Sequence, residues 1–146
     1  MKLKPLKLVL FLPFISSLLA PEAQALQAIV NRSVSQPSIT LENLGSIFKF
    51  ETENWANGKK ISIVSFDSSL VFPKANEPYL ECMGQTLDKF KAKFSKSTFR
   101  GEMNTPVFFE DNLEALIKKV NEIEGAIAIL PDKVILEGAK FIEIKN

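Results

Sequence analysis

The sequence predicts an α/β domain in which a central mixed sheet is flanked by helices. Three observations support this fold class. Short apolar runs are typical of strands, apolar stripes at three- and four-residue spacing are typical of helices, and the two kinds of segment alternate along the 146-residue chain. No internal repeat or low-complexity tract interrupts them, and a chain of this length suits one modest domain.

The first 25 residues are predicted to be a secretory signal peptide and not part of the fold. The segment has a basic head, an apolar run from Leu8 to Ala20 and a small-x-small cleavage pattern at Ala23 and Ala25. The apolar run is shorter than the roughly 20 residues that cross a membrane. We therefore expect a signal peptide at residues 1–25 and, at residues 26–146, a secreted, periplasmic domain that is not embedded in the membrane.

Charge and cysteine content exclude some classes of protein. The formal net charge is +1, and removal of residues 1–25 takes away three lysines and one glutamate, which leaves −1. This balance excludes a strongly basic nucleic-acid binder. Cys82 is the only cysteine, so no internal disulfide can form and none lies at the cleavage point for lipid attachment. Because Cys82 lies in an apolar-periodic run, we expect it to be a buried packing residue.

The first half of the domain is expected to form two strands around a short helix. Ala28–Val34 has the composition of a strand, and Thr40 is a good N-cap for a helix over Leu41–Phe48. Asn57-Gly58 then predicts a turn into a strand that holds Ile61, Val64 and Phe66. Helix and strand should pack together, with Trp55 covering one edge of this scaffold and not stacking on a ligand. Residues 66–78 are rich in turn formers and predict a loop.

One long helix is predicted next. Its apolar stripe recurs at spacings of 3, 4, 3 and 4, at Leu80, Met83, Leu87, Phe90 and Phe94. The other faces carry Lys89, Lys91, Lys93 and Lys96, with Arg100 beyond. These basic side chains have two interpretations. They form either a solvated face whose aliphatic chains cover apolar neighbours, or a positively charged surface that attracts an anion or an acidic partner.

The C-terminal part is expected to add a helix and two strands. Ser97–Phe109 is predicted to be loop and extended chain, followed by a helix over Asn112–Glu122 with Gly125 as its C-cap. Ala126–Leu130 is a buried-type strand, and the alternation around Ile142 and Ile144 predicts a last strand.

The residue types needed for most enzyme chemistry are missing. The chain has no histidine, which removes the usual general base and the commonest metal ligand. It also has no glycine-rich phosphate loop. The carboxylates lie mostly on predicted solvent faces, although a Ser-Lys or carboxylate-only enzyme is not excluded by composition. We expect a non-enzymatic protein with no cofactor and no metal.

Several short motifs resemble the phosphate ABC transporter substrate-binding protein family, in particular its short, single-domain secreted members. The shared features, in chain order, are Ile47-Phe48 ending a helix, Trp55, Asn57-Gly58, the strand Ile61–Val64 and Gly125-Ala126-Ile127. The resemblance covers most of the chain after residue 25. It implies the type 2 periplasmic-binding-protein fold, here about one lobe of it by length.

The resemblance also indicates where a ligand would bind. Relatives that bind phosphate follow the strand with an arginine and a Ser-Gly-Thr-Thr-like turn that opens a helix, whereas this chain has Phe66-Asp67-Ser68-Ser69 there. The serine pair is retained, the arginine is missing, and Asp67 would repel an anion unless it accepted a proton from it. The predicted ligand-binding residues are Thr40, Asp67, Ser68, Ser69 and Arg100.

Two functions follow from these expectations. The first is a periplasmic solute-binding-like protein that holds phosphate or another small oxyanion for a membrane ABC transporter. The second is a non-catalytic interaction or signalling module that kept the fold, lost the ligand and contacts a membrane-bound transporter or sensor protein. For Ser68 and Ser69, the alternative to a ligand site is an ordinary capped loop.

Overall fold

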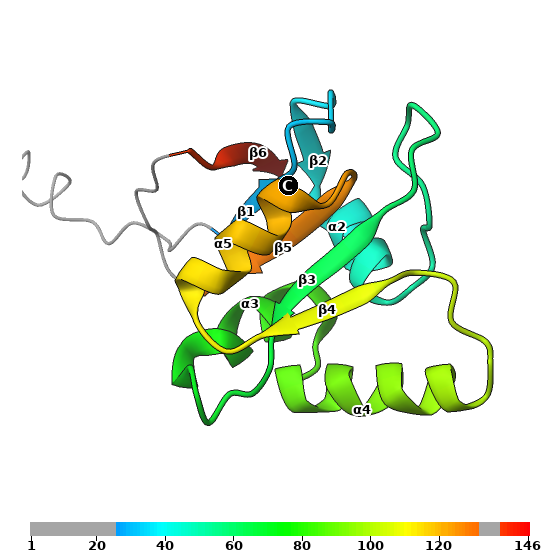
Figure 1. Cartoon of the computed structure of the whole chain (residues 1–146), viewed down its shortest axis with the longest axis vertical. Coiled ribbons are helices and arrows are strands. Elements are labelled where there is room, and N and C mark those ends of the chain that lie inside the picture. Colours follow the sequence, from blue (N-terminus) through cyan, green and yellow to red (C-terminus); the bar gives the residue numbers. More distant parts are fainter. Residues whose placement is uncertain (1–25, 132–137) are drawn as a thin grey trace, which may run out of the picture.

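The computed structural model describes residues 26–131 and 138–146, and the predicted signal peptide lies outside them. It confirms the α/β fold with a six-stranded mixed sheet flanked by helices, in the strand order β2-β6-β1-β5-β3-β4 (Figure 1). The strands are β1 (Gln27–Val30), β2 (Ser38–Thr40), β3 (Ser62–Phe66), β4 (Val107–Glu110), β5 (Ala126–Leu130) and β6 (Lys140–Lys145). The helices are α2 (Leu41–Phe48), α3 (Asn76–Met83), α4 (Leu87–Phe99) and α5 (Leu113–Glu122), with a 3-10 turn at Pro73–Ala75.

Strand direction determines which loops share an edge of the sheet. β1 runs antiparallel to its neighbours β5 and β6, whereas β2–β6, β3–β5 and β3–β4 are parallel pairs. Five strands therefore point the same way, and their carboxyl ends lie at one edge. None of the helices in residues 26–131 and 138–146 has the length and apolar character needed to cross a bilayer.

The helices cover the sheet from both sides. α5 packs on β3, β4 and β5, and α3 and α4 lie on the other side of β3 and β4 (Figure 1). Successive side chains of β4 point alternately to the two faces of the sheet, and so to different helices. Phe108 faces Lys119 of α5, whereas Phe109 lies 5.6 Å from the ring of Phe94 of α4.

Aromatic rings join α2, α3, α4 and β4 in one cluster. Phe90 lies at its centre, with ring centroids 6.0 Å from Phe48, 5.1 Å from Tyr79 and 6.4 Å from Phe109. The Tyr79 hydroxyl shares a hydrogen bond with the hydroxyl of Ser65 in β3. Burial raises the pKa of Tyr79 far above its usual value, so this phenol stays protonated and holds α3 to the sheet.

The single long helix predicted from the apolar stripe is wrong, because the chain breaks between α3 and α4. Gly84 takes up a left-handed conformation (φ 70°) and ends α3. Thr86 then caps α4 by accepting a hydrogen bond from the backbone N–H of Lys89. As a result Leu80, the first residue of the predicted stripe, is 49% exposed.

Other boundaries differ by a few residues. α4 continues to Phe99, into the segment predicted to be loop, and α5 ends at Glu122 with Ile123 as its cap in place of Gly125. β1 ends at Val30 because the buried side chain of Asn31 leaves the sheet and donates hydrogen bonds to the carbonyls of Val120 (2.8 Å) and Asn121 (3.1 Å). These bonds tie the end of β1 to the end of α5.

Cys82 is buried in α3, which confirms the packing role predicted for it. Burial raises the pKa of its thiol to about 12. The thiolate, which is the reactive form of cysteine, is therefore scarce at neutral pH.

Candidate functional site

The predicted ligand residues Asp67, Ser68 and Ser69 lie directly after the carboxyl end of β3. The backbone N–H of Asp67 donates to the carbonyl of Glu110 (2.8 Å), which ties the ends of β3 and β4 together. In α/β proteins with parallel strands, ligands bind preferentially beyond the carboxyl ends of the strands. The fold therefore places this segment where a small solute is commonly held.

Two side chains from α4 complete the cluster. Lys91 Nζ lies 2.5 Å from Oδ1 of Asp67 and 3.0 Å from its backbone carbonyl. The hydroxyl of Ser69 donates to Oδ2 of Asp88 (2.7 Å), and the Ser68 hydroxyl oxygen accepts from the backbone N–H of Leu70 (3.0 Å). We call Asp67, Ser68, Ser69, Asp88 and Lys91 the β3-edge cluster.

The charges of the β3-edge cluster suit a ligand that both donates and accepts hydrogen bonds. The Lys91 ammonium is paired with the Asp67 carboxylate, and the Asp88 carboxylate accepts from Ser69. The Asp67 and Lys91 side chains are only half-buried, so solvent or a ligand can reach them. Lys91 and the Ser68 hydroxyl can donate hydrogen bonds to an oxyanion, whereas the Asp67 carboxylate can accept one from a protonated oxygen of the ligand. In the described part of the chain, no group of acidic or thiol side chains is arranged to hold a metal ion.

Thr40 and Arg100, the other two predicted ligand residues, lie away from this cluster. Thr40 ends β2, and three strands, β6, β1 and β5, lie between β2 and β3 in the strand order. Its hydroxyl already accepts a hydrogen bond from the backbone N–H of Asn43, as the helix cap predicted from the sequence. Arg100 follows the last residue of α4, roughly 13 Å along the helix axis from Lys91 at about 1.5 Å per residue.

Lys91 and Asp88 are the residues of the β3-edge cluster that the sequence did not reveal. They lie about 20 positions beyond Asp67–Ser69 and across the α3–α4 break, so no local spacing connects them. Lys91 differs from the other lysines of α4 in one respect that the sequence does show. It shares the helix face of Leu87 and Phe94, which points toward the sheet.

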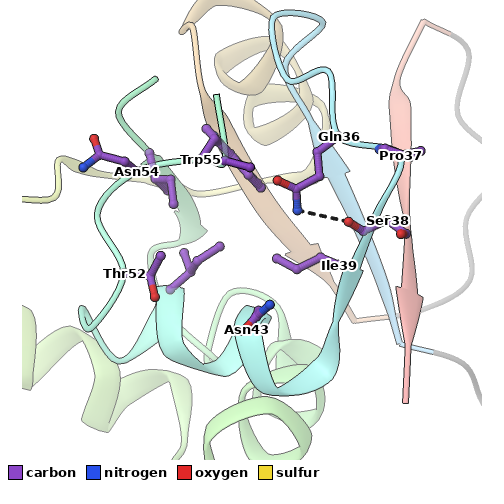
Figure 2. A pocket seen from close by; sticks show the side chains of 11 residues that line it. Gln36, Pro37, Ser38, Ile39, Asn43, Thr52, Asn54 and Trp55 are labelled. Atoms are coloured by element: carbon purple, nitrogen blue, oxygen red, sulfur yellow. Dashed lines mark hydrogen bonds between the residues drawn. The ribbon is translucent and has the colours of Figure 1, made fainter. Parts of the chain in front are cut away.

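A separate pocket of about 450 Å³ lies near the amino ends of β2 and β3 (Figure 2). Its lining comes from Gln36–Ile39, Asn43 and Ile47 of α2, Thr52, Asn54–Ala56 and Ile61. Trp55 is only 4% exposed, and its indole N–H donates to the carbonyl of Gly125 (2.9 Å). Trp55 therefore packs in the core, as predicted, and it also lines this pocket.

Comparison with known proteins gives structural but not sequence relatives. No protein-family model and no curated protein sequence matches the chain. The chain is similar in structure to an ABC-type phosphate transport receptor from Vibrio cholerae, with a TM-score of 0.52 and 16% identity, over 83% of this chain and 46% of the receptor. It is similar to PstS from Borrelia burgdorferi with a TM-score of 0.52 and 17% identity, over 83% of this chain and 47% of that protein. The chain therefore has the fold of these proteins and spans about half the length of each.

Proposed function

We propose that the protein is a secreted, periplasmic solute-binding-like protein that holds a small, protonated oxyanion such as phosphate at the β3-edge cluster. The observation that carries this proposal is the position of Lys91 Nζ, 2.5 Å from Asp67, which directly precedes two serines at the carboxyl end of β3. In phosphate-binding relatives an arginine after the strand supplies positive charge. This chain lacks that arginine, and Lys91 supplies the charge in its place. The shared fold with two proteins of phosphate transport supports the choice of ligand.

The chemistry of the cluster favours phosphate over a fully ionised anion. At neutral pH phosphate carries a proton on one oxygen, and that oxygen can donate to the Asp67 carboxylate while the others accept from Lys91 and Ser68. Sulfate has no such proton, so one of its oxygens would face Asp67 with like charge. Thr40 and Arg100 are too far from Asp67 to contact the same small ion, so the proposal rests on the β3-edge cluster alone. An ABC transporter in the membrane would be the receiving partner.

Phosphate is expected to raise the thermal stability of the protein, and loss of Lys91 is expected to abolish the effect. At a hundredfold excess over its dissociation constant, a ligand of the folded state adds about 2.7 kcal/mol to the free energy of unfolding. Differential scanning fluorimetry should show this for phosphate, with a smaller shift for sulfate at equal ionic strength. The Lys91→Met variant should lose the shift, whereas Lys93→Met, two residues along the same helix and exposed, should keep it. Equal shifts in both variants, or none in the natural sequence, would contradict the proposal.

One surface favours the second function, an interaction module for an acidic partner. Four exposed basic residues spaced by 4, 3 and 4 form a stripe along α4 and its C-cap, and none has an ion pair with another residue of the described chain: Lys89, Lys93, Lys96 and Arg100. The net charge of the chain is only +1, whereas these four positive charges lie together along one helix. Such a stripe steers and orients a partner with an acidic surface, for which a membrane-bound transporter or sensor protein is the proposed candidate.

Charge reversal of the stripe tests this second function. Chemical cross-linking in the envelope of the source cell should capture a partner with the natural sequence, and Lys93→Glu combined with Lys96→Glu should reduce its yield about tenfold or more. Lys118→Glu, an exposed lysine of α5, is the matched control and should leave the yield unchanged. Recovery of uncross-linked monomer alone, or equal capture by the double variant, would rule out the stripe as a docking surface.

A further inference from the structure

The pocket beside Trp55 lies at the edge of the sheet opposite the β3-edge cluster. Ser38 begins β2 and Ile61 directly precedes β3, so both mark the amino ends of parallel strands, whereas Asp67 follows a carboxyl end. Four of the lining side chains are buried and form an apolar floor: Ile39, Ile47, Trp55 and Ile61. The volume of about 450 Å³ falls within the range of roughly 300–1,000 Å³ that is typical of small-molecule sites.

Among the residues that the structure describes, no charged side chain lines this pocket, although charged residues are abundant in the segments that build it. The rim consists of Gln36, Ser38, Asn43, Thr52 and Asn54. Thr52 and Asn54 alternate with Glu51 and Glu53, and only the neutral pair belongs to the lining. An ionised ligand would give up its hydration here without meeting an opposite charge. The lining therefore favours a neutral ligand.

The rim offers donors and acceptors in the mixture that hydroxyl groups match. The Gln36 amide donates to the carbonyl of Ser38 (3.0 Å), which fixes the side chain and leaves its carbonyl oxygen as an acceptor (Figure 2). Figure 2 shows Gln36, Ile39 and Asn43 directed into the same space. Within residues 26–131 and 138–146, the side chains of Asn43 and Thr52 make no hydrogen bond, so both remain able to donate to and accept from a ligand.

We propose that this pocket binds a neutral saccharide of one or two rings. A sugar ring has hydroxyl groups, which are donors and acceptors at once, around an apolar C–H face. The carboxamides and hydroxyls of the rim suit the former, and the small apolar surface that Ile39, Ile47 and Trp55 keep exposed suits the latter. The site is separate from the β3-edge cluster and does not depend on phosphate binding there.

The sequence contains a built-in reporter for this proposal. Trp55 is the only tryptophan of the chain, so the intrinsic emission of the protein comes from a side chain that lines the pocket. Glucose, galactose, N-acetylglucosamine and maltose should be titrated in the millimolar range while emission is followed, and heats of binding should be recorded by calorimetry in parallel. We expect a saturable signal with at least one of these sugars. Glucuronate, a charged sugar of the same ring size, should bind at least roughly tenfold more weakly.

Two substitutions on α2 separate specific binding from other effects. Asn43→Ala removes a rim carboxamide and should weaken the best sugar roughly threefold to tenfold, as expected for one hydrogen bond. Glu42→Ala changes the adjacent exposed residue, which does not line the pocket, and should leave the affinity unchanged. Lys91→Met should also leave it unchanged, so failure at one site is distinguished from failure at the other. No saturable signal by either method with any of the four sugars, or equal affinity for glucuronate, would overturn the proposal.

Discussion

Replacing Gly125 by alanine is expected to lower the free energy of unfolding by about 3–5 kcal/mol, because a left-handed backbone and a steric clash act at the same residue. Gly125 has a φ of 74°, where side chains other than that of glycine are strained. A Cβ atom there would lie 2.1 Å from the backbone carbonyl oxygen of Lys60. Because that oxygen belongs to the backbone, the clash cannot be relieved by rotating a side chain.

Any shift of the backbone at Gly125 would also disturb three hydrogen bonds. The Gly125 carbonyl accepts from the indole N–H of Trp55 (2.9 Å) and from the backbone N–H of Ser62 (3.2 Å). Its own N–H donates to the hydroxyl of Ser33 (2.8 Å). Gly125 thereby links the starts of β3 and β5 to the loop that follows β1, so the substitution affects the centre of the sheet.

Gly101→Ala is the matched control for this prediction. Gly101 has nearly the same φ, 71°, but a Cβ atom there would meet nothing within 4 Å. It should therefore cost only the conformational strain, about 1–2 kcal/mol. Urea denaturation of both variants measures the difference directly. Equal losses in the two variants would show that the contact with Lys60 does not contribute.

The sequence predicted the elements whose ends carry their own local signals. Thr40 and the apolar spacing after it predicted α2 over Leu41–Phe48, and the run Ala126–Leu130 predicted β5 with the bounds that the structure has. The prediction of a single helix across α3 and α4 was wrong because the apolar stripe from Leu80 to Phe94 fits one helix as well as two. Gly84 and Thr86, which separate the two helices, are a C-cap and an N-cap whose signals were outweighed by the longer periodicity.

The candidate site was predictable only in its local part. Asp67, Ser68 and Ser69 are consecutive after a clear strand, so their place at a carboxyl end follows from the strand itself. Lys91 reaches Asp67 only because α3 and α4 fold back across β3 and β4, which is a tertiary arrangement with no counterpart in local spacing. Thr40 and Arg100 were grouped with Asp67 on residue type. The strand order separates Thr40 from Asp67, and the length of α4 separates Arg100 from Lys91.

Truncation of Phe90 to alanine is expected to lower the free energy of unfolding by about 3–5 kcal/mol, through lost apolar burial and the cavity left behind. Phe90 is only 1% exposed, and its ring contacts aromatic side chains from four segments: Phe48, Phe50, Tyr79 and Phe109. Those partners are held by α2, the turn after it, α3 and β4, so the space cannot collapse by movement of one side chain. The loss in free energy of unfolding should therefore lie near the upper end of the range of about 3–5 kcal/mol for truncation of a buried phenylalanine.

The same helix supplies the control for Phe90. Phe99, nine residues further along α4, is 93% exposed, and Phe99→Ala should change the free energy of unfolding by no more than about 0.5 kcal/mol. Phe90→Leu should fall between the two, because it keeps most of the apolar volume but loses the ring contacts. Urea denaturation of the three variants should therefore rank them Phe90→Ala, Phe90→Leu and Phe99→Ala in decreasing loss. If Phe90→Ala cost no more than Phe99→Ala, the packing of α4 on the sheet would contribute little to stability.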